Sequence, residues 1–123
     1  MNQYNQQLHW HCLRHTSTKK CANECFLQGL FALFGKKHTL PIIRQLLMEN
    51  KLRFNEIQEK VGGSPKTIVD RLRELETHGL IHRETFNEIP IRVEYSLTKP
   101  GKDMEKIFEM IILWIKTWLI KGS

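Results

Sequence analysis

The sequence predicts a mostly helical α+β fold. Two helical patterns meet at a pair of glycines, Gly62 and Gly63. After Gly79 the apolar residues change from helical spacing to alternation, which is typical of strands. A long apolar segment, residues 102–121, then closes the chain. The expected order is therefore helices, a β-hairpin and a terminal helix.

The segment from Phe54 to Gly79 predicts a short helix, a glycine turn and a longer helix. Ser64 can cap the second helix, and Pro65 suits its first turn because the missing N–H is not needed there. This arrangement is typical of a helix-turn-helix, whose second helix can lie in the DNA major groove. An ordinary helical hairpin within a core is the alternative. The inward positions are Ile57, Val61, Ile68, Leu72 and Leu75.

The second of these helices, residues 64–78, is the predicted recognition helix. Its first two turns would reach base edges in the groove. Arg and Lys can donate to guanine, Thr can bond a base, and Asp can accept from cytosine. Solvated surface side chains are the alternative interpretation. The candidate DNA-binding residues of this helix are Ser64, Lys66, Thr67, Asp70, Arg71 and Arg73.

Residues 80–86 and 92–98 are predicted strands, joined by a tip that contains Pro90. A hairpin directly after a recognition helix is a wing, here residues 86–92. Arg92 at its base can meet the phosphate backbone or the minor groove. Arg83 is instead expected to pair with a helix acid such as Glu76.

Helices are also expected at residues 24–34, at 39–50 with Thr39 as its cap, and at about 102–121. The last is apolar on most sides and must be buried on most sides, which favours a homodimer. A two-fold dimer would read a palindromic operator. A small-molecule pocket at the tryptophans is the alternative. The candidate interface residues are Phe26, Leu30, Ile107, Ile111, Trp114, Ile115 and Trp118.

Two regions are expected, a flexible polar tail at 1–23 and a DNA-binding domain with its dimerisation helix at 24–123. The tail gathers histidines and a cysteine, which are ligands that zinc, nickel and copper accept. A metal-responsive regulator is therefore one alternative. The cysteine spacing matches no structural zinc pattern, so no metal or cofactor is assigned. The tail residues concerned are His9, His11, Cys12 and His15.

The net charge of +6 suits a polyanionic partner. The excess is not in the predicted DNA-binding region, because residues 51–92 hold eight Lys/Arg and seven Asp/Glu. Whether this region suits DNA must therefore be judged from the positions of its charges and not from their sum. No catalytic motif or phosphate-binding loop is present, which argues against an enzyme. No signal segment or membrane-spanning run is apparent, so a cytoplasmic protein is expected.

Six features of the chain form one recognisable pattern: GKKHTLPIIRQLL (35–47), RFNEI (53–57), RLRELETHGLI (71–81), Pro90, VEYSLT (93–98) and Gly101. Together they resemble the HxlR-type transcriptional regulators, winged-helix proteins related to the MarR group. The resemblance implies a homodimeric DNA-binding regulator whose helix at Ser64 to His78 reads the major groove. The chain departs from the family at His38, where tryptophan is usual, and at Phe26, where proline is usual.

The resemblance also implies a site at Cys25, because many members of the family carry a cysteine there and some sense oxidants or electrophiles. We expect Cys25 near a helix N-terminus, where the dipole would favour the thiolate. Cys21, one turn earlier, is a candidate resolving thiol. A small buried hydrophobe is the alternative for Cys25. The expected function is a transcriptional regulator with an oxidant or small-molecule effector, and a winged-helix protein-interaction module without DNA affinity is its main competitor.

Overall fold

The computed structural model describes residues 18–120, with side chains from residue 24 onward. The chain divides into two compact units, residues 1–39 and 40–123, which are described separately. The mostly helical α+β fold is confirmed. The elements are α2 (Thr18–Phe34), α3 (Thr39–Glu49), β1 (Lys51–Arg53), α4 (Phe54–Val61), α5 (Pro65–Thr77), β2 (Ile81–Phe86), β3 (Arg92–Leu97), α6 (Lys99–Lys102) and α7 (Met104–Trp118).

The first unit contributes α2, which begins at Thr18 rather than at the expected Glu24. The last residues of the expected tail are therefore helical. The buried positions of α2 are Cys25, Gly29 and Leu33, which recur every four residues on one side of the helix. Phe26, a candidate interface residue, is 60% exposed.

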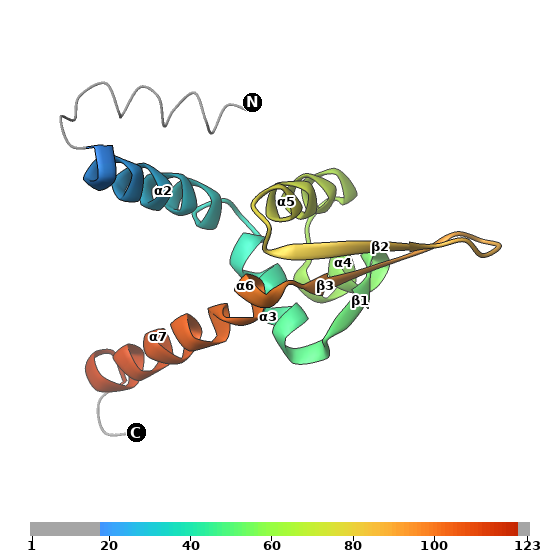
Figure 1. Cartoon of the computed structure of the whole chain (residues 1–123). Helices are drawn as coiled ribbons and strands as arrows, with labels where there is room; N and C mark the ends of the chain where they lie inside the picture. Colours follow the sequence, from blue (N-terminus) through green and yellow to red (C-terminus); the bar gives the residue numbers. More distant parts are fainter. Residues whose placement is uncertain (1–17, 121–123) are drawn as a thin grey trace. The chain divides into compact units, whose positions relative to one another are not determined.

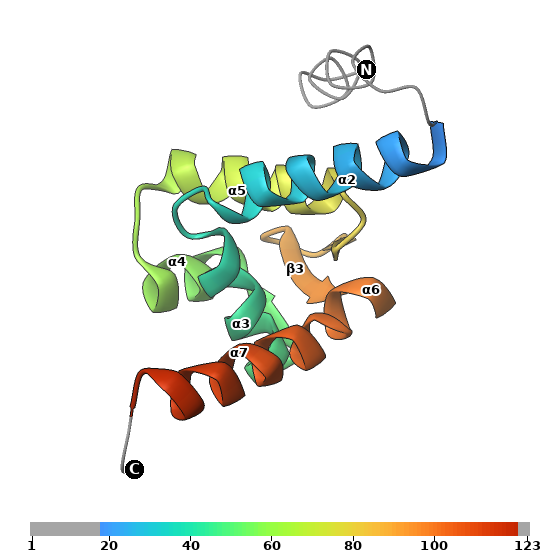
Figure 2. The same ribbon diagram turned by 90° about the vertical axis from the view of Figure 1, so that its left-hand side faces the viewer.

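The second unit has a core built from one side of each helix. Figure 2 shows α3 and α4 lying together with β3 beside them. Thr39, the expected cap of α3, is instead its first residue. Its Oγ1 atom is buried and has no hydrogen-bond partner among residues 18–120, so the capping prediction is wrong. The fully buried side chains of the three core helices are Ile42, Ile43, Leu46, Ile57, Ile68, Leu72 and Leu75.

A three-stranded antiparallel sheet completes this core, in the order β1-β3-β2. The short segment before α4 is a true strand, because Leu52 pairs with Tyr95 of the central strand. At the other edge Ile81 pairs with Leu97, and both are buried. β2 begins one residue later than the predicted strand, and β3 ends one residue earlier.

The β2–β3 hairpin extends well beyond the helices of this unit (Figure 1). Its last pair is Phe86 opposite Arg92, and the tip is residues 87–91. It therefore has the form of the expected wing.

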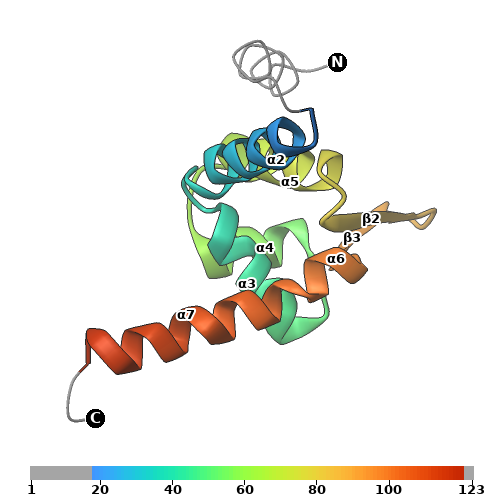
Figure 3. The ribbon, with the colours of Figure 1, turned by 60° about the vertical axis from the view of Figure 1, so that its left-hand side comes forward.

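The terminal helix differs from the prediction, since a short helix, α6, precedes α7 and α7 ends at Trp118. Thr98 caps α6 by accepting a hydrogen bond from the N–H of Gly101 at 3.3 Å. A Cβ atom at Gly101 would lie 2.1 Å from the carbonyl oxygen of Leu80, so only glycine fits where α6 meets the residue before β2. Figure 3 shows α7 extending from α6 away from the sheet.

Candidate nucleic-acid interface

The turn between α4 and α5 has the geometry that its glycines and serine predict. Gly62 and Gly63 have φ angles of 85° and 93°, which other residues rarely adopt. Ser64 then caps α5, because its side chain accepts a hydrogen bond from the N–H of Thr67 at 3.2 Å. Pro65 occupies the first helical position. The glycine turn, the Ser64 cap and Pro65 therefore fix the start of α5, which is the end predicted to contact bases.

The outer side of α5 carries two exposed cations, Lys66 and Arg73. Thr67 and Asp70 lie beside them and are half-buried. These residues form a polar surface at the N-terminal end of the helix, with one positive charge in the first turn. This surface can donate and accept hydrogen bonds, as base edges require.

Arg71 is less available than the sequence suggests. Its side chain is only 18% exposed and forms an ion pair with Glu74, one turn further along α5. The guanidinium group therefore has a partner within the helix.

The end of α5 is joined to the β2–β3 hairpin at the end opposite its tip. Gly79 has a φ of 75°, and the N–H of Leu80 bonds the carbonyl of Leu75 at 3.0 Å, as in a Schellman motif. The hydroxyl of Thr98, just after β3, donates to the carbonyl of Gly79 at 2.6 Å. The helix end and the hairpin base are thus fixed to each other within one unit, a connection that the sequence did not indicate.

Arg92 is built into the wing rather than projecting from it. Its guanidinium carbon lies 4.0 Å from the centre of the Phe86 ring. The same group forms ion pairs with Glu88 at 3.2 Å and with Glu94 at 3.6 Å. These partners were missed, although the cross-strand pairing of residues 86 and 92 is a signal that could have located the Phe86 contact.

The wing tip itself is apolar. Ile89 is fully exposed and Ile91 is 67% exposed, on either side of Pro90. No lysine or arginine lies within residues 87–91. A contact of this tip with DNA would therefore be an apolar contact in a groove rather than an ion pair with phosphate.

The expected pairing of Arg83 with Glu76 is absent. Both side chains are exposed, and the described part of the chain contains no ion pair between them. Instead they line an open cavity between α5 and the β2–β3 hairpin, together with Arg73 and Tyr95.

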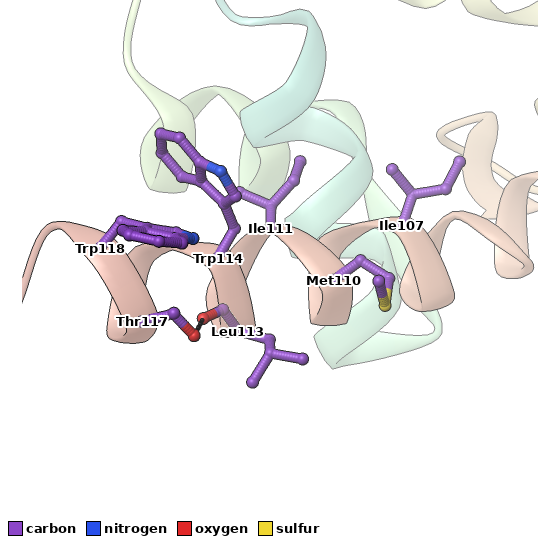
Figure 4. Close-up of a pocket in the computed structure, with 7 residues that line it drawn as sticks. All are labelled: Ile107, Met110, Ile111, Leu113, Trp114, Thr117 and Trp118. Carbon is purple, nitrogen blue, oxygen red and sulfur yellow. Dashed lines mark hydrogen bonds between the residues drawn. The ribbon is translucent and has the colours of Figure 1, made fainter.

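An apolar surface runs along α7. Trp114 and Trp118 are 55% and 62% exposed, and Figure 4 shows that the side chains of this surface all come from the single helix α7. They border an open hollow of about 490 Å³. A small-molecule pocket at these tryptophans was the alternative interpretation of the sequence. The residues that line the hollow are Ile107, Met110, Ile111, Leu113, Trp114, Thr117 and Trp118.

Cys25 does not have the expected surroundings. It is 2% exposed and lies two turns inside α2, because that helix begins at Thr18. Cys25 is therefore not near a helix N-terminus as expected, and the effect of the helix dipole is confined to the first turn. The proposed metal ligands His9, His11, Cys12 and His15 lie outside the described residues, as does the side chain of Cys21.

Comparison with known proteins agrees with this geometry. A family model for the HxlR-like helix-turn-helix matches residues 33–123. The chain belongs to the HxlR-like helix-turn-helix family. An HTH-type transcriptional regulator of Synechocystis is 36% identical over 80% of this chain and 73% of its own length. YodB, an HTH-type transcriptional regulator of Bacillus subtilis, is 34% identical over 79% of this chain and 87% of its own length.

Solved structures show the same relationship. The reduced form of YodB superposes with a TM-score of 0.67 at 32% identity, covering 78% of this chain and 94% of YodB. The redox regulator HypR in its oxidized form superposes with a TM-score of 0.61 at 29% identity, covering 76% of this chain and 96% of HypR. The winged-helix expectation is confirmed. The protein is a helix-turn-helix transcriptional regulator and not an enzyme.

None of the helices from α2 to α7 combines the length and the apolar character needed to cross a membrane.

Proposed function

We propose that this regulator binds a specific sequence of double-stranded DNA, with α5 in the major groove. The observation that carries the proposal is the capped N-terminal end of α5, where exposed Lys66 lies beside Thr67 and Asp70. These residues occupy the two turns from which such helices contact base edges. Arg73 lies further along α5 and is exposed, so that it can contact the phosphate backbone.

Arg71 belongs to the same surface and is paired there with Glu74. The ion pair with Glu74 holds the guanidinium against the helix, which reduces the number of conformations it must lose on binding. On DNA, the guanidinium group of Arg71 would leave the carboxylate of Glu74 and bind the edge of a guanine instead. Arg71 would then specify guanine at the operator position that it faces.

The active form is a homodimer assembled through α7, with Phe26 and Leu30 of α2 as a second part of the interface. Support comes from the apolar side chains of α7, since water-exposed surfaces of this kind are typical of association sites. Ile107, Ile111, Trp114 and Trp118 recur at helical spacing, as a packed helix pair requires. Ile115, which is half-buried, lies at the edge of this stripe.

The wing, residues 86–92, supplies a second DNA contact. Its tip enters the minor groove with Ile89 and Ile91, whereas Arg92 keeps the hairpin rigid from within. Apolar side chains are used in this way by proteins that contact the minor groove.

We also propose that Cys25 is where an oxidant or electrophile acts on the protein. The support is the similarity to YodB, whose structures include diamide-treated and quinone-bound forms at 30% and 29% identity, and to HypR. Because Cys25 is 2% exposed, its reaction requires a motion that uncovers the side chain.

The deciding experiment is selection of random-sequence duplexes by the purified protein, before and after mild oxidation. A palindromic motif with half-sites about one helical turn apart is expected from the reduced protein. Loss of enrichment after oxidation would support the thiol response, and unchanged enrichment would remove it. Absence of any enriched motif would overturn the DNA-binding proposal and favour a protein-interaction module.

A further inference from the structure

The cavity between α5 and the β2–β3 hairpin has a volume of about 460 Å³ and an unusual lining. Arg73 of α5 and Arg83 of β2 border it from opposite elements. Tyr95 and Glu76 are its other polar residues, and Val69 and Leu72 are its apolar residues. We name this feature the arginine notch.

Neither arginine is committed to the fold. Both side chains are exposed, and within residues 24–120 neither takes part in an ion pair. This contrasts with Arg71, which pairs with Glu74, and with Arg92, which pairs with Glu88 and Glu94. The two uncommitted guanidinium groups are therefore available for an anion from outside the chain.

The walls of the notch are rigid relative to each other. Arg83 lies directly opposite Tyr95 in the sheet, and Tyr95 in turn pairs with Leu52 of β1. The hydrogen bond from Thr98 to the carbonyl of Gly79 ties the end of α5 to the end of the hairpin. The elements that carry the two arginines are therefore fixed relative to each other, so that binding of an anion needs to order only the side chains, which lowers the entropic cost of binding.

Adjacent grooves of a duplex are separated by one sugar–phosphate backbone. A protein with one element in each groove must therefore have that backbone between the two elements. The arginine notch is lined by residues of α5 and of the β2–β3 hairpin, and Figure 1 shows α5 beside this hairpin, whose far end is the wing. We propose that it binds one phosphate of the DNA backbone in each protomer, held by Arg83 with Arg73 beside it. This proposal rests on DNA binding by α5 and adds the contact that fixes the register of the helix on the duplex.

Glu76 gives the notch a second property. Its carboxylate borders the same cavity and repels an incoming phosphate. The acid thereby weakens contacts with DNA of any sequence, so that binding also depends on the base contacts of α5. The Glu76→Gln variant is expected to bind non-operator duplex several-fold more tightly than the native protein.

The test compares the salt dependence of duplex binding for the native protein, Arg83→Gln, Arg83→Lys and the control Arg44→Gln. Arg44 is an exposed arginine of α3, outside both walls of the notch. The affinity falls with salt, and loss of one phosphate contact lowers the magnitude of the slope of log K against log salt by about 0.9. Arg83→Gln in a dimer should therefore lower the slope by about 1.8, and equally for operator and non-operator DNA. Arg83→Lys should retain the slope, because it keeps the charge.

A second readout identifies the phosphate. Neutral methylphosphonate linkages are placed singly along the operator, and the native protein should lose affinity at one linkage in each half-site. The Arg83→Gln variant should show no further loss at that linkage. Additive losses, or a slope equal to that of the native protein, would overturn the phosphate assignment. A native protein that binds no duplex would instead refute the proposed function itself, so the two failures are distinguishable.

Discussion

The guanidinium of Arg92 lies over the ring of Phe86, its direct partner across the wing, with 4.0 Å between the guanidinium carbon and the ring centre. Two carboxylates, of Glu88 and Glu94, hold the other edges of the group. Arg92 therefore links three residues of the hairpin, and its charge is neutralised before any DNA arrives.

The variant Arg92→Ala should destabilise the wing more than it changes the electrostatics of DNA binding. A half-buried cation–π contact contributes about 0.5–1 kcal/mol, and partly exposed ion pairs add little. We expect the free energy of unfolding in urea to fall by about 1 kcal/mol. The salt slope of duplex binding should stay close to the native value, in contrast to Arg83→Gln. A slope reduced as in Arg83→Gln would show that Arg92 contacts phosphate directly.

The variants Lys66→Ala and Arg71→Ala should differ in their effects on the folded protein. Lys66 is exposed, so its removal should weaken operator binding roughly tenfold and leave the urea midpoint unchanged. Arg71 is paired with Glu74, so its removal should weaken binding and also lower stability slightly. Fluorescence anisotropy with labelled operator and urea titration measure both quantities. Unchanged operator affinity in both variants would contradict the assignment of α5 as the recognition helix.

Cys25 should react slowly with a bulky thiol reagent while the protein is folded. The side chain is 2% exposed, and it lies too far inside α2 for the helix dipole to favour the thiolate. The Cys12→Ser/Cys21→Ser double variant isolates this thiol, because the chain has three cysteines. Reaction with an aromatic disulfide, followed by absorbance, should accelerate strongly in urea. An equally fast reaction without urea would show that Cys25 is open to oxidants in the native state.

The sequence predicts α4, the turn and α5 well, because each local signal acts within one turn of its residue. Gly62, Ser64 and Gly79 all appear in the predicted roles. The start of α2 was misplaced, because apolar spacing begins at Glu24 whereas the helix includes the polar turn before it.

The partners of the arginines were harder to predict, because they depend on register and rotamer. Whether Arg83 meets Glu76 or faces an open cavity depends on how α5 lies against the hairpin, which no local pattern specifies. Arg92 was recognised as a wing cation, but its two glutamates were not, since ion pairing across and along the hairpin requires the positions of all three side chains.

The variant Trp114→Asp should convert the proposed homodimer to monomers. The side chain is 55% exposed in the single chain and lies in the middle of the apolar stripe of α7, so a carboxylate there would be buried without a partner on association. Sedimentation velocity should show the change in mass. Lys116→Asp is the matched control, because position 116 is exposed and lies on the opposite side of the same helix. Trp114→Ser removes the ring without adding charge and should weaken association in the same direction. If both Trp114 variants remain dimers at low micromolar concentration, the interface lies elsewhere. If Trp114→Asp instead gives monomers, their affinity for the operator should fall far more than the loss of a single base contact explains. The reason is that linking two half-site contacts raises the effective concentration of the second.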